Sequence, residues 1–214
     1  MCVTLQYRNL ENNIKNIDMK NVMKFGLALV VFFTAFTMRA NDGNFSVSVK
    51  SGKVISFAIN EAKNVHVSIF NTDGGEVFNE TLKSKDGKIT RTYDLTALPA
   101  GTYFLETETA TKVSRHEITI NGTTATVAGT VVAETYKPVV FTKDGIVTVS
   151  ILNNGKSPVE IKMYDDNNNE VYSETVNGEQ TLAKRFNIKS TTAKNFTLVT
   201  KYNNKTFVEA VAAR

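Results

Sequence analysis

The sequence predicts an all-β protein in which two tandem β-sandwich domains follow an N-terminal signal peptide. Three observations carry this prediction. Short segments with an apolar residue at every second position recur along the chain, turn-forming residues separate them, and the second half of the chain repeats the first. The 214 residues are enough for two small domains.

Residues 19–40 have the pattern of a secretory signal peptide. Lys20 and Lys24 precede an apolar run over residues 25–36, and Ala40 is a small residue at its exit. We expect cleavage after Ala40, with an uncleaved N-terminal anchor as the alternative. The apolar run is shorter than the roughly 20 residues that a membrane-spanning helix needs, so we expect no stable transmembrane span in the mature chain.

Residues 1–18 do not fit a signal peptide, and we interpret them as a leader that results from a start codon assigned too early. Met19 and Met23 would each give a conventional start. Cys2 is the only cysteine of the chain. The mature protein would then contain no cysteine and form no disulfide.

The charge of the chain does not point to a nucleic-acid partner. Residues 1–40 hold five basic and two acidic residues, and the rest of the chain holds 20 basic and 19 acidic ones. A nucleic-acid-binding domain would show a basic patch or stripe. The nearly neutral remainder has no such cluster, so we expect no nucleic-acid binding.

The internal repeat is clearest between YDLTALPAGTYFLE at residues 93–106 and FNIKSTTAKNFTLV at residues 186–199, which lie 93 residues apart. Two further pairs keep nearly this separation: GKVISFAIN (52–60) with GIVTVSILN (145–153), 93 residues apart, and VHVSIF (65–70) with VEIKMY (159–164), 94 residues apart. So constant a separation predicts two copies of one domain, at residues 45–120 and 138–213.

Each copy shows the pattern of a β-sandwich. Val65, Val67 and Ile69 alternate with other residues, which places them on one face of a strand. Turn signals such as Asp73-Gly74-Gly75 tolerate the positive φ angles of tight hairpins. Six or seven such strands in about 76 residues, with regular turns between them, predict a sandwich of two sheets.

A structural corner is expected in the first copy. Pro99 fixes φ in a turn, Gly101 relieves its exit, and Tyr103 enters the core from the following strand. The second copy keeps the aromatic residue as Phe196 but has Thr192 and Lys194 in place of the proline and the glycine. We therefore expect both copies to keep the core aromatic but not the turn.

Residues 121–137 lie between the copies. The segment 121–133 has no charged residue and is rich in Thr, Val, Ala and Gly. Two interpretations stay open, a linker or an extra strand at a sheet edge. A domain of this size without disulfides is marginally stable alone, so we expect the copies to pack together or to share this strand.

The sequence lacks the residue patterns of catalysis. We expect both histidines, His66 and His116, to be solvated or at the rim, because a zinc site needs several ligands and a hydrolase needs a base beside its nucleophile. No Gly-x-Ser-x-Gly motif occurs. Glu106 and Glu108 share one strand face, which we expect to be solvated rather than a glycosidase pair. We predict no enzyme activity and no cofactor.

The strongest metal candidate is a weak calcium site. Asp165, Asn167 and Asn169 offer oxygen ligands at the spacing of the first half of an EF-hand loop, and Glu170 follows them. The sixth position of that loop is Glu170 rather than glycine, and the twelfth is Val176 rather than glutamate. An ordinary hairpin turn is the interpretation that we favour, so no metal is assigned.

Several aromatic residues leave two interpretations open. Phe70, Phe78 and Phe104 would form a sugar-stacking face if they were exposed in a row. They would equally fill a sandwich or an interface between the copies, and we favour this second interpretation.

The first copy resembles the C-terminal sorting domain of type IX secretion cargo from the phylum Bacteroidota. The resemblance covers about residues 64–120 and is carried by VHVSIFNTDGGEVFNE, YDLTALPAGTYFLE and KVSRHEITI. It implies an immunoglobulin-like or fibronectin-like sandwich of seven strands that serves as a signal for export or surface attachment. The second copy is a degenerate match, because it lacks the proline and glycine of the corner.

These observations predict a general role for the protein but no specific activity. We expect an exported, non-enzymatic protein of the periplasm, cell surface or extracellular space that acts in interaction or adhesion at the bacterial envelope. Its partner would be a protein or a surface glycan, and secretion machinery is a further expected partner. The alternatives are a type IX secretion substrate whose second copy is a C-terminal sorting domain, and a carbohydrate-binding accessory module.

Overall fold

The computed structural model describes residues 2–4, 45–60, 63–128 and 131–213. The predicted signal peptide at 19–40 and all but residues 2–4 of the predicted leader lie outside these ranges. Regular structure in the described ranges consists of β-strands, which confirms the all-β prediction. No helix in these ranges has the length and apolar character needed to cross a membrane.

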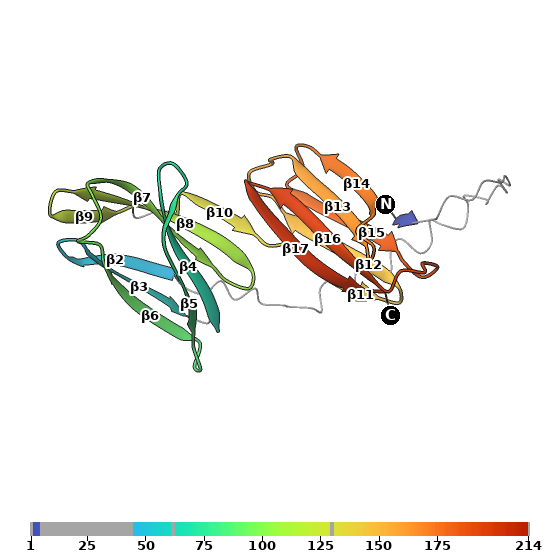
Figure 1. The fold of residues 1–214 in the computed structure, drawn as a ribbon, viewed down its shortest axis with the longest axis horizontal. Coiled ribbons are helices and arrows are strands. Elements are labelled where there is room, and N and C mark those ends of the chain that lie inside the picture. Colours follow the sequence, from blue (N-terminus) through green and yellow to red (C-terminus); the bar gives the residue numbers. More distant parts are fainter. Residues whose placement is uncertain (1, 5–44, 61–62, 129–130, 214) are drawn as a thin grey trace. The chain divides into compact units, whose positions relative to one another are not determined.

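The first sandwich consists of seven strands in two sheets (Figure 1). One sheet has the order β2-β3-β6, and the other contains β5, β4, β7 and β8 side by side. The strands are β2 (Phe45–Ser51), β3 (Val54–Asn60), β4 (Asn64–Asn71), β5 (Glu76–Lys83), β6 (Lys88–Asp94), β7 (Gly101–Glu108) and β8 (Lys112–Asn121).

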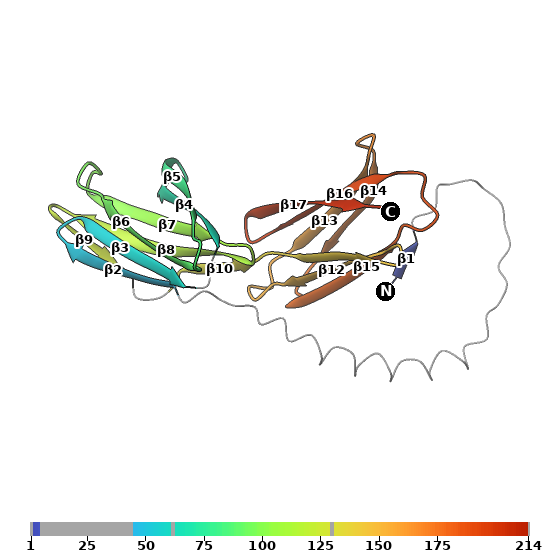
Figure 2. The ribbon, with the colours of Figure 1, turned by 90° about the horizontal axis from the view of Figure 1, so that it is seen from below.

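The second sandwich repeats this arrangement strand for strand. Its sheets have the orders β11-β12-β15 and β14-β13-β16-β17, and Figure 2 shows them as two separate layers. Three strands facing four is the immunoglobulin-like arrangement that the sequence predicts. The strands are β11 (Val139–Lys143), β12 (Ile146–Leu152), β13 (Val159–Asp165), β14 (Glu170–Val176), β15 (Thr181–Asn187), β16 (Asn195–Tyr202) and β17 (Lys205–Ala212).

Alternating residues from both sheets form the core of each sandwich. In β13 every second residue is buried, because the period of two sends Val159, Ile161 and Met163 to the same face. In the first sandwich Val65, Val67 and Ile69 of β4 do the same. Each core therefore follows from the apolar alternation read in the sequence.

The ladders correct one detail of the repeat. Ile55, Phe57 and Ile59 of β3 are buried, and their structural equivalents in β12 are Val147, Val149 and Ile151, which lie 92 residues further on rather than 93. A separation of 93 would place the polar face of β12 in the core, because a shift of one residue exchanges the faces of a strand. The other strand pairs keep the separations of 93 and 94.

Residues 121–137, for which a linker and an extra edge strand were both open, contain two short strands. These are β9 (Thr124–Val127) and β10 (Ala133–Tyr136), and both pair antiparallel with β8. A further strand, β1 (Cys2–Thr4), pairs in parallel with β15. The outer edge of β8 is thus covered by the segment that follows it in the chain.

Candidate functional site

The expected corner is present in the first sandwich. The Tyr103 hydroxyl donates a hydrogen bond to the Pro99 carbonyl oxygen at 3.1 Å, and the Tyr103 side chain is buried in the core. Gly101 has a φ of 155°, a conformation that side-chain-bearing residues rarely adopt. The arrangement fixes the turn between β6 and β7, as the tyrosine corner does in immunoglobulin-like sandwiches.

The second sandwich keeps the core aromatic without the hydroxyl. Phe196 is 3% exposed and packs in the second core. Its turn is closed by other bonds: the Thr191 amide donates to the Ile188 carbonyl oxygen at 3.3 Å, and the Ala193 amide donates to the Thr191 hydroxyl at 3.2 Å. In both sandwiches the corner residues thus hold the turn or fill the core.

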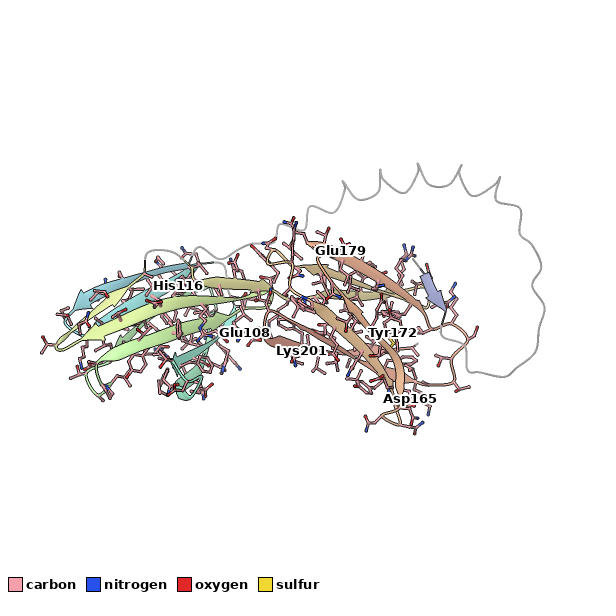
Figure 3. The ribbon with its side chains drawn as sticks, turned by 90° about the horizontal axis from the view of Figure 1, so that it is seen from above. Glu108, His116, Asp165, Tyr172, Glu179 and Lys201 are labelled. Carbon is pink, nitrogen blue, oxygen red and sulfur yellow. The ribbon has the colours of Figure 1, made fainter. Side chains whose placement is uncertain are left out.

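The expectation that both histidines are solvated or at the rim is wrong for His116, which is 5% exposed (Figure 3). Its ring lies 4.3 Å from the ring of Phe45, on the same face of β8 as Ile118 and Ile120. Burial lowers the pKa of the imidazole, which opposes protonation. His66 lies on the outer face of β4, where its Nδ1 is 3.0 Å from the Thr81 hydroxyl.

Glu106 and Glu108 each have a lysine partner instead of facing each other. Glu106 is 8% exposed and forms an ion pair with Lys205, so the expectation of a solvated face is wrong for this residue. Glu108 pairs with Lys137 at 2.6 Å between Oε1 and Nζ. Each carboxylate is thus engaged by its own cation in the fold.

Asp165 organises the turn between β13 and β14 through its own carboxylate. Its Oδ1 accepts hydrogen bonds from the amides of Asn167 and Asn169, both at 2.9 Å, and its Oδ2 accepts from Asn169 Nδ2 at 3.0 Å. These bonds use the oxygens that a calcium ion would need. Within the described ranges no three His, Cys, Asp or Glu side chains come together as a metal-binding group.

The aromatic side chains do not form a free row for sugar stacking. The Arg115 guanidinium lies over the Phe104 ring at 3.9 Å and near the Phe70 ring at 6.0 Å. Phe78 packs edge-on against Tyr93, with 5.1 Å between ring centres. Phe70 and Phe104 thus engage Arg115 through cation–π contacts, and Phe78 packs on an aromatic ring of the other sheet while 38% of it stays exposed.

Both sandwiches contain a cluster that was not predicted from the sequence, here called the Tyr–Glu–cation cluster. In the first sandwich, Tyr93 donates to Glu80 at 2.6 Å and Arg91 lies 3.6 Å from the same carboxylate. In the second, Tyr172 donates to Glu174, and Lys184 pairs with that carboxylate at 2.7 Å.

The position of the tyrosine differs between the two clusters. The first sandwich has Phe78 on β5 and Tyr93 on β6, whereas the second has Tyr172 on β14 and Phe186 on β15 (Figure 3 labels Tyr172). The repeated glutamate in EVFNET and EVYSET was a signal for this cluster. The cluster joins β5 to β6 in the first sandwich and β14 to β15 in the second, so it links the two sheets of each sandwich.

The first sandwich matches a known protein family. Residues 42–121 match the family model described as the secretion system C-terminal sorting domain. This match confirms the resemblance that the sequence motifs carry. It covers the first sandwich and does not extend to the second. A secretion sorting domain implies export to the cell surface or the extracellular space.

No curated protein matches the chain. Among solved structures, the chain is similar to the BSP domain of a biofilm associated protein, with 15% identity, coverage of 78% of this chain and a TM-score of 0.26. The chain spans about 28% of the length of that structure. A two-domain fibronectin type-III segment from chicken tenascin has 10% identity, coverage of 79% of this chain and 98% of the segment, and a TM-score of 0.27.

Proposed function

We propose that the protein is an exported, non-enzymatic β-sandwich protein that acts in interaction or adhesion at the bacterial envelope. The match of residues 42–121 to a secretion sorting domain carries this proposal. A domain of this kind directs its chain out of the cell, and a sandwich presents strand edges on which partners can dock. The second sandwich is then the part of the chain that is free to contact a partner.

The contacts of the titratable side chains support a non-enzymatic role. The histidine that is buried stacks on Phe45, and the paired glutamates of β7 are each neutralised by a lysine. A catalytic site needs an acid, a base or a nucleophile that converge on one reacting atom. The buried histidine and the two glutamates are instead engaged in contacts of the fold, which supports the proposal.

A protein partner fits better than a surface glycan. Sugar-binding faces present aromatic rings to solvent, but Arg115 lies over Phe104 and the Phe78 ring packs on Tyr93. The contacts of these phenylalanines therefore favour a protein partner over the carbohydrate-binding alternative.

A second proposal is that the first sandwich is the sorting signal for type IX secretion. The family match favours this sandwich and gives no support to the alternative in which the second sandwich is the sorting domain. The corner at Tyr103 and Pro99, which the second sandwich lacks, is the clearest structural difference between the two.

Fractionation of the full chain tests both proposals. The chain is expressed in a bacterium with a type IX system and in an isogenic strain without its outer-membrane translocon. We expect the protein on the surface or in the medium of the first strain and in the periplasm of the second. Retention in the cytoplasm of both strains would contradict export, and an identical external distribution would contradict sorting by the type IX route.

A further inference from the structure

The second sandwich has a hollow along one side, between the edge strands of its two sheets. β11 is the last strand of one sheet and β17 the last strand of the other. The hollow has a volume of about 470 Å³, and its lining includes Val140, Phe141, Asp144, Glu209, Val211 and Ala213. It therefore opens directly onto the side chains of the second core.

The first sandwich fills the same place with its own strand β9. β9 lies beside β8, the equivalent of β17, and the Ala125 amide donates to the Gly52 carbonyl oxygen at 2.8 Å at the end of β2. Ala125 is 4% exposed and belongs to the first core. The equivalent of Gly52 in the second sandwich is Asp144. The Leu95 amide donates to the carbonyl oxygen of Lys53, which follows Gly52, and the equivalent Ile188 amide donates to that of Gly145, which follows Asp144. Asp144 lines the hollow.

The edge of β17 is open where the edge of β8 is covered. Among the described residues, β17 pairs only with β16, and β11 pairs only with β12. In the first sandwich the carbonyl oxygens of Glu117 and Arg115 accept hydrogen bonds from Ala128 and Val132 at 3.0 and 2.8 Å. The β17 residues at these two positions are Ala210 and Val208. Their backbone groups thus face away from β16.

Apolar side chains are exposed on both edge strands. Val208 is 61% exposed on β17, and Val139 and Phe141 are 55% and 50% exposed on β11. Natural sheets usually protect their edges with charges, prolines or a covering segment, because an open edge is a template for a further strand. The two edges here carry apolar residues beside the hollow, which is the arrangement of a strand acceptor.

We propose that the side of the second sandwich between β11 and β17 binds an extended strand of a partner protein, which adds antiparallel to β17 as β9 adds to β8. This inference rests on the proposed function and names the surface and the chemistry of the partner. Apart from the position opposite Glu209, the strand carries small, uncharged residues on its inward face, as β9 does at Ala125, so that they enter the hollow.

A basic residue in the partner strand is expected opposite Glu209. Glu209 occupies the position of His116 in the repeat, since each pairs with the equivalent leucine of the neighbouring strand. His116 is covered by Phe45, whereas Glu209 is exposed and lines the hollow. An inward carboxylate at an edge disfavours an apolar strand, and a lysine facing it provides charge complementarity.

Peptide binding to the purified full chain tests the proposal. The probe is a labelled peptide with the sequence of residues 121–128, and a second probe carries one added lysine at its carboxyl end. In a peptide that binds β17 in the register of β9 on β8, this lysine lies opposite Glu209. We expect saturable binding of both, with the lysine peptide bound about fivefold more tightly, the effect of one partly exposed ion pair. The variant Glu209→Gln is expected to remove this preference.

Ala210→Pro is the blocking variant, because proline removes an outward amide that the added strand would use while the ladder to β16 keeps its bonds. Ala210→Thr keeps the amide and is the matched control. We expect the proline variant to lose binding at least about tenfold, with an unchanged circular dichroism spectrum, and the threonine variant to bind normally. Thermal melting of Ala210→Pro verifies that it is folded, and Val208→Pro provides a second block at the next outward amide.

Three results would overturn the proposal: no binding by the folded wild-type chain, equal binding by the folded proline variants, or a dimer in light scattering that Ala210→Pro dissolves. The dimer would assign the edge to a second copy of the chain. Because these measurements use purified protein, they are independent of export. A failed acceptor site with normal secretion refutes only this inference, and normal peptide binding with no secretion refutes only the proposed function.

Discussion

Replacing Glu174 by glutamine should destabilise the second sandwich more than the same change at Glu80 destabilises the first. Both glutamates receive a tyrosine hydroxyl and a cation in the Tyr–Glu–cation cluster. The substitution keeps the size of the side chain and removes its charge. The two sandwiches thus give a matched pair in one chain.

The expected magnitudes follow from the exposure of the cations. The Lys184 side chain is 11% exposed and contacts Glu174 at 2.7 Å, whereas Arg91 is 53% exposed and lies 3.6 Å from Glu80. A hydrogen-bonded charge is worth about 1.5–3 kcal/mol, and because Glu174 is itself 38% exposed we expect about 2 kcal/mol for Glu174→Gln. For Glu80→Gln, where the ion pair is solvated, we expect about 1 kcal/mol.

The pH dependence of the stability provides an independent test. The hydrogen bond from Lys184, followed by that from Tyr172, holds the pKa of Glu174 below its ordinary value of 4.5. The stabilisation is therefore present above pH 4.5 and is lost as the pH falls through the lower pKa of the folded state. The glutamine variant should not show this loss.

Urea unfolding followed by far-ultraviolet circular dichroism and tyrosine fluorescence measures these differences, since the chain has no tryptophan. Curves at pH 7 and at several values below pH 4.5 give the free energy of unfolding of the wild type and both variants. Equal losses for the two substitutions at pH 7 would refute the reasoning from exposure. A wild type and a Glu174→Gln variant with the same acid dependence would refute the assignment of the charge.

Three further predictions concern single residues. Tyr103→Phe removes the bond to the Pro99 carbonyl and should cost about 1 kcal/mol in urea unfolding, while a Phe196→Leu change tests only packing. Burial lowers the pKa of His116, so the unfolded chain binds a proton first as the pH falls below 6.5; His116→Phe should remove that part of the stability loss between pH 6.5 and 5, with a persistent slope contradicting it. Asp165→Ala should cost about 1–2 kcal/mol through its turn bonds, and 5 mM calcium should leave the wild-type melting temperature within about 1 °C, a larger rise being evidence for a metal site.

The strands were predictable because their signal is local. The alternation of Val65, Val67 and Ile69 and the glycine and asparagine turns establish where strands begin and end without knowledge of their partners. The register in which the strands pair was harder to predict from the sequence. The register of β12 differs by one residue from the sequence repeat, because the separation of 93 aligns Gly52 with Gly145, whereas the apolar faces of β3 and β12 match only at 92.

The environment of individual side chains was the least predictable feature. His116 shares its face with Ile118 and Ile120, which was visible in the sequence, but its burial depends on Phe45 from the other sheet. The ion pair of Glu106 with Lys205 joins residues 99 positions apart. Contacts of this kind depend on how sheets pack, and no local pattern encodes them.

The hollow of the second sandwich also could not be predicted from the sequence. Residues 121–137 were recognised as a segment that either links the copies or adds a strand, but only the ladder shows that β9 enters the first core. The unfilled side of the second sandwich becomes visible when the two sandwiches are compared strand for strand. Because the two sandwiches are repeats of each other, the first shows where, among the described residues, the second lacks a strand equivalent to β9.

Intact mass spectrometry of the native protein in periplasmic, outer-membrane and medium fractions tests the central claim most directly. An exported two-sandwich interaction protein should appear outside the cytoplasm as a species that begins at Asn41 and retains both sandwiches. A species truncated between residues 121 and 137, or one with a large C-terminal adduct, would make the second sandwich a processed sorting tail. That result would contradict the account.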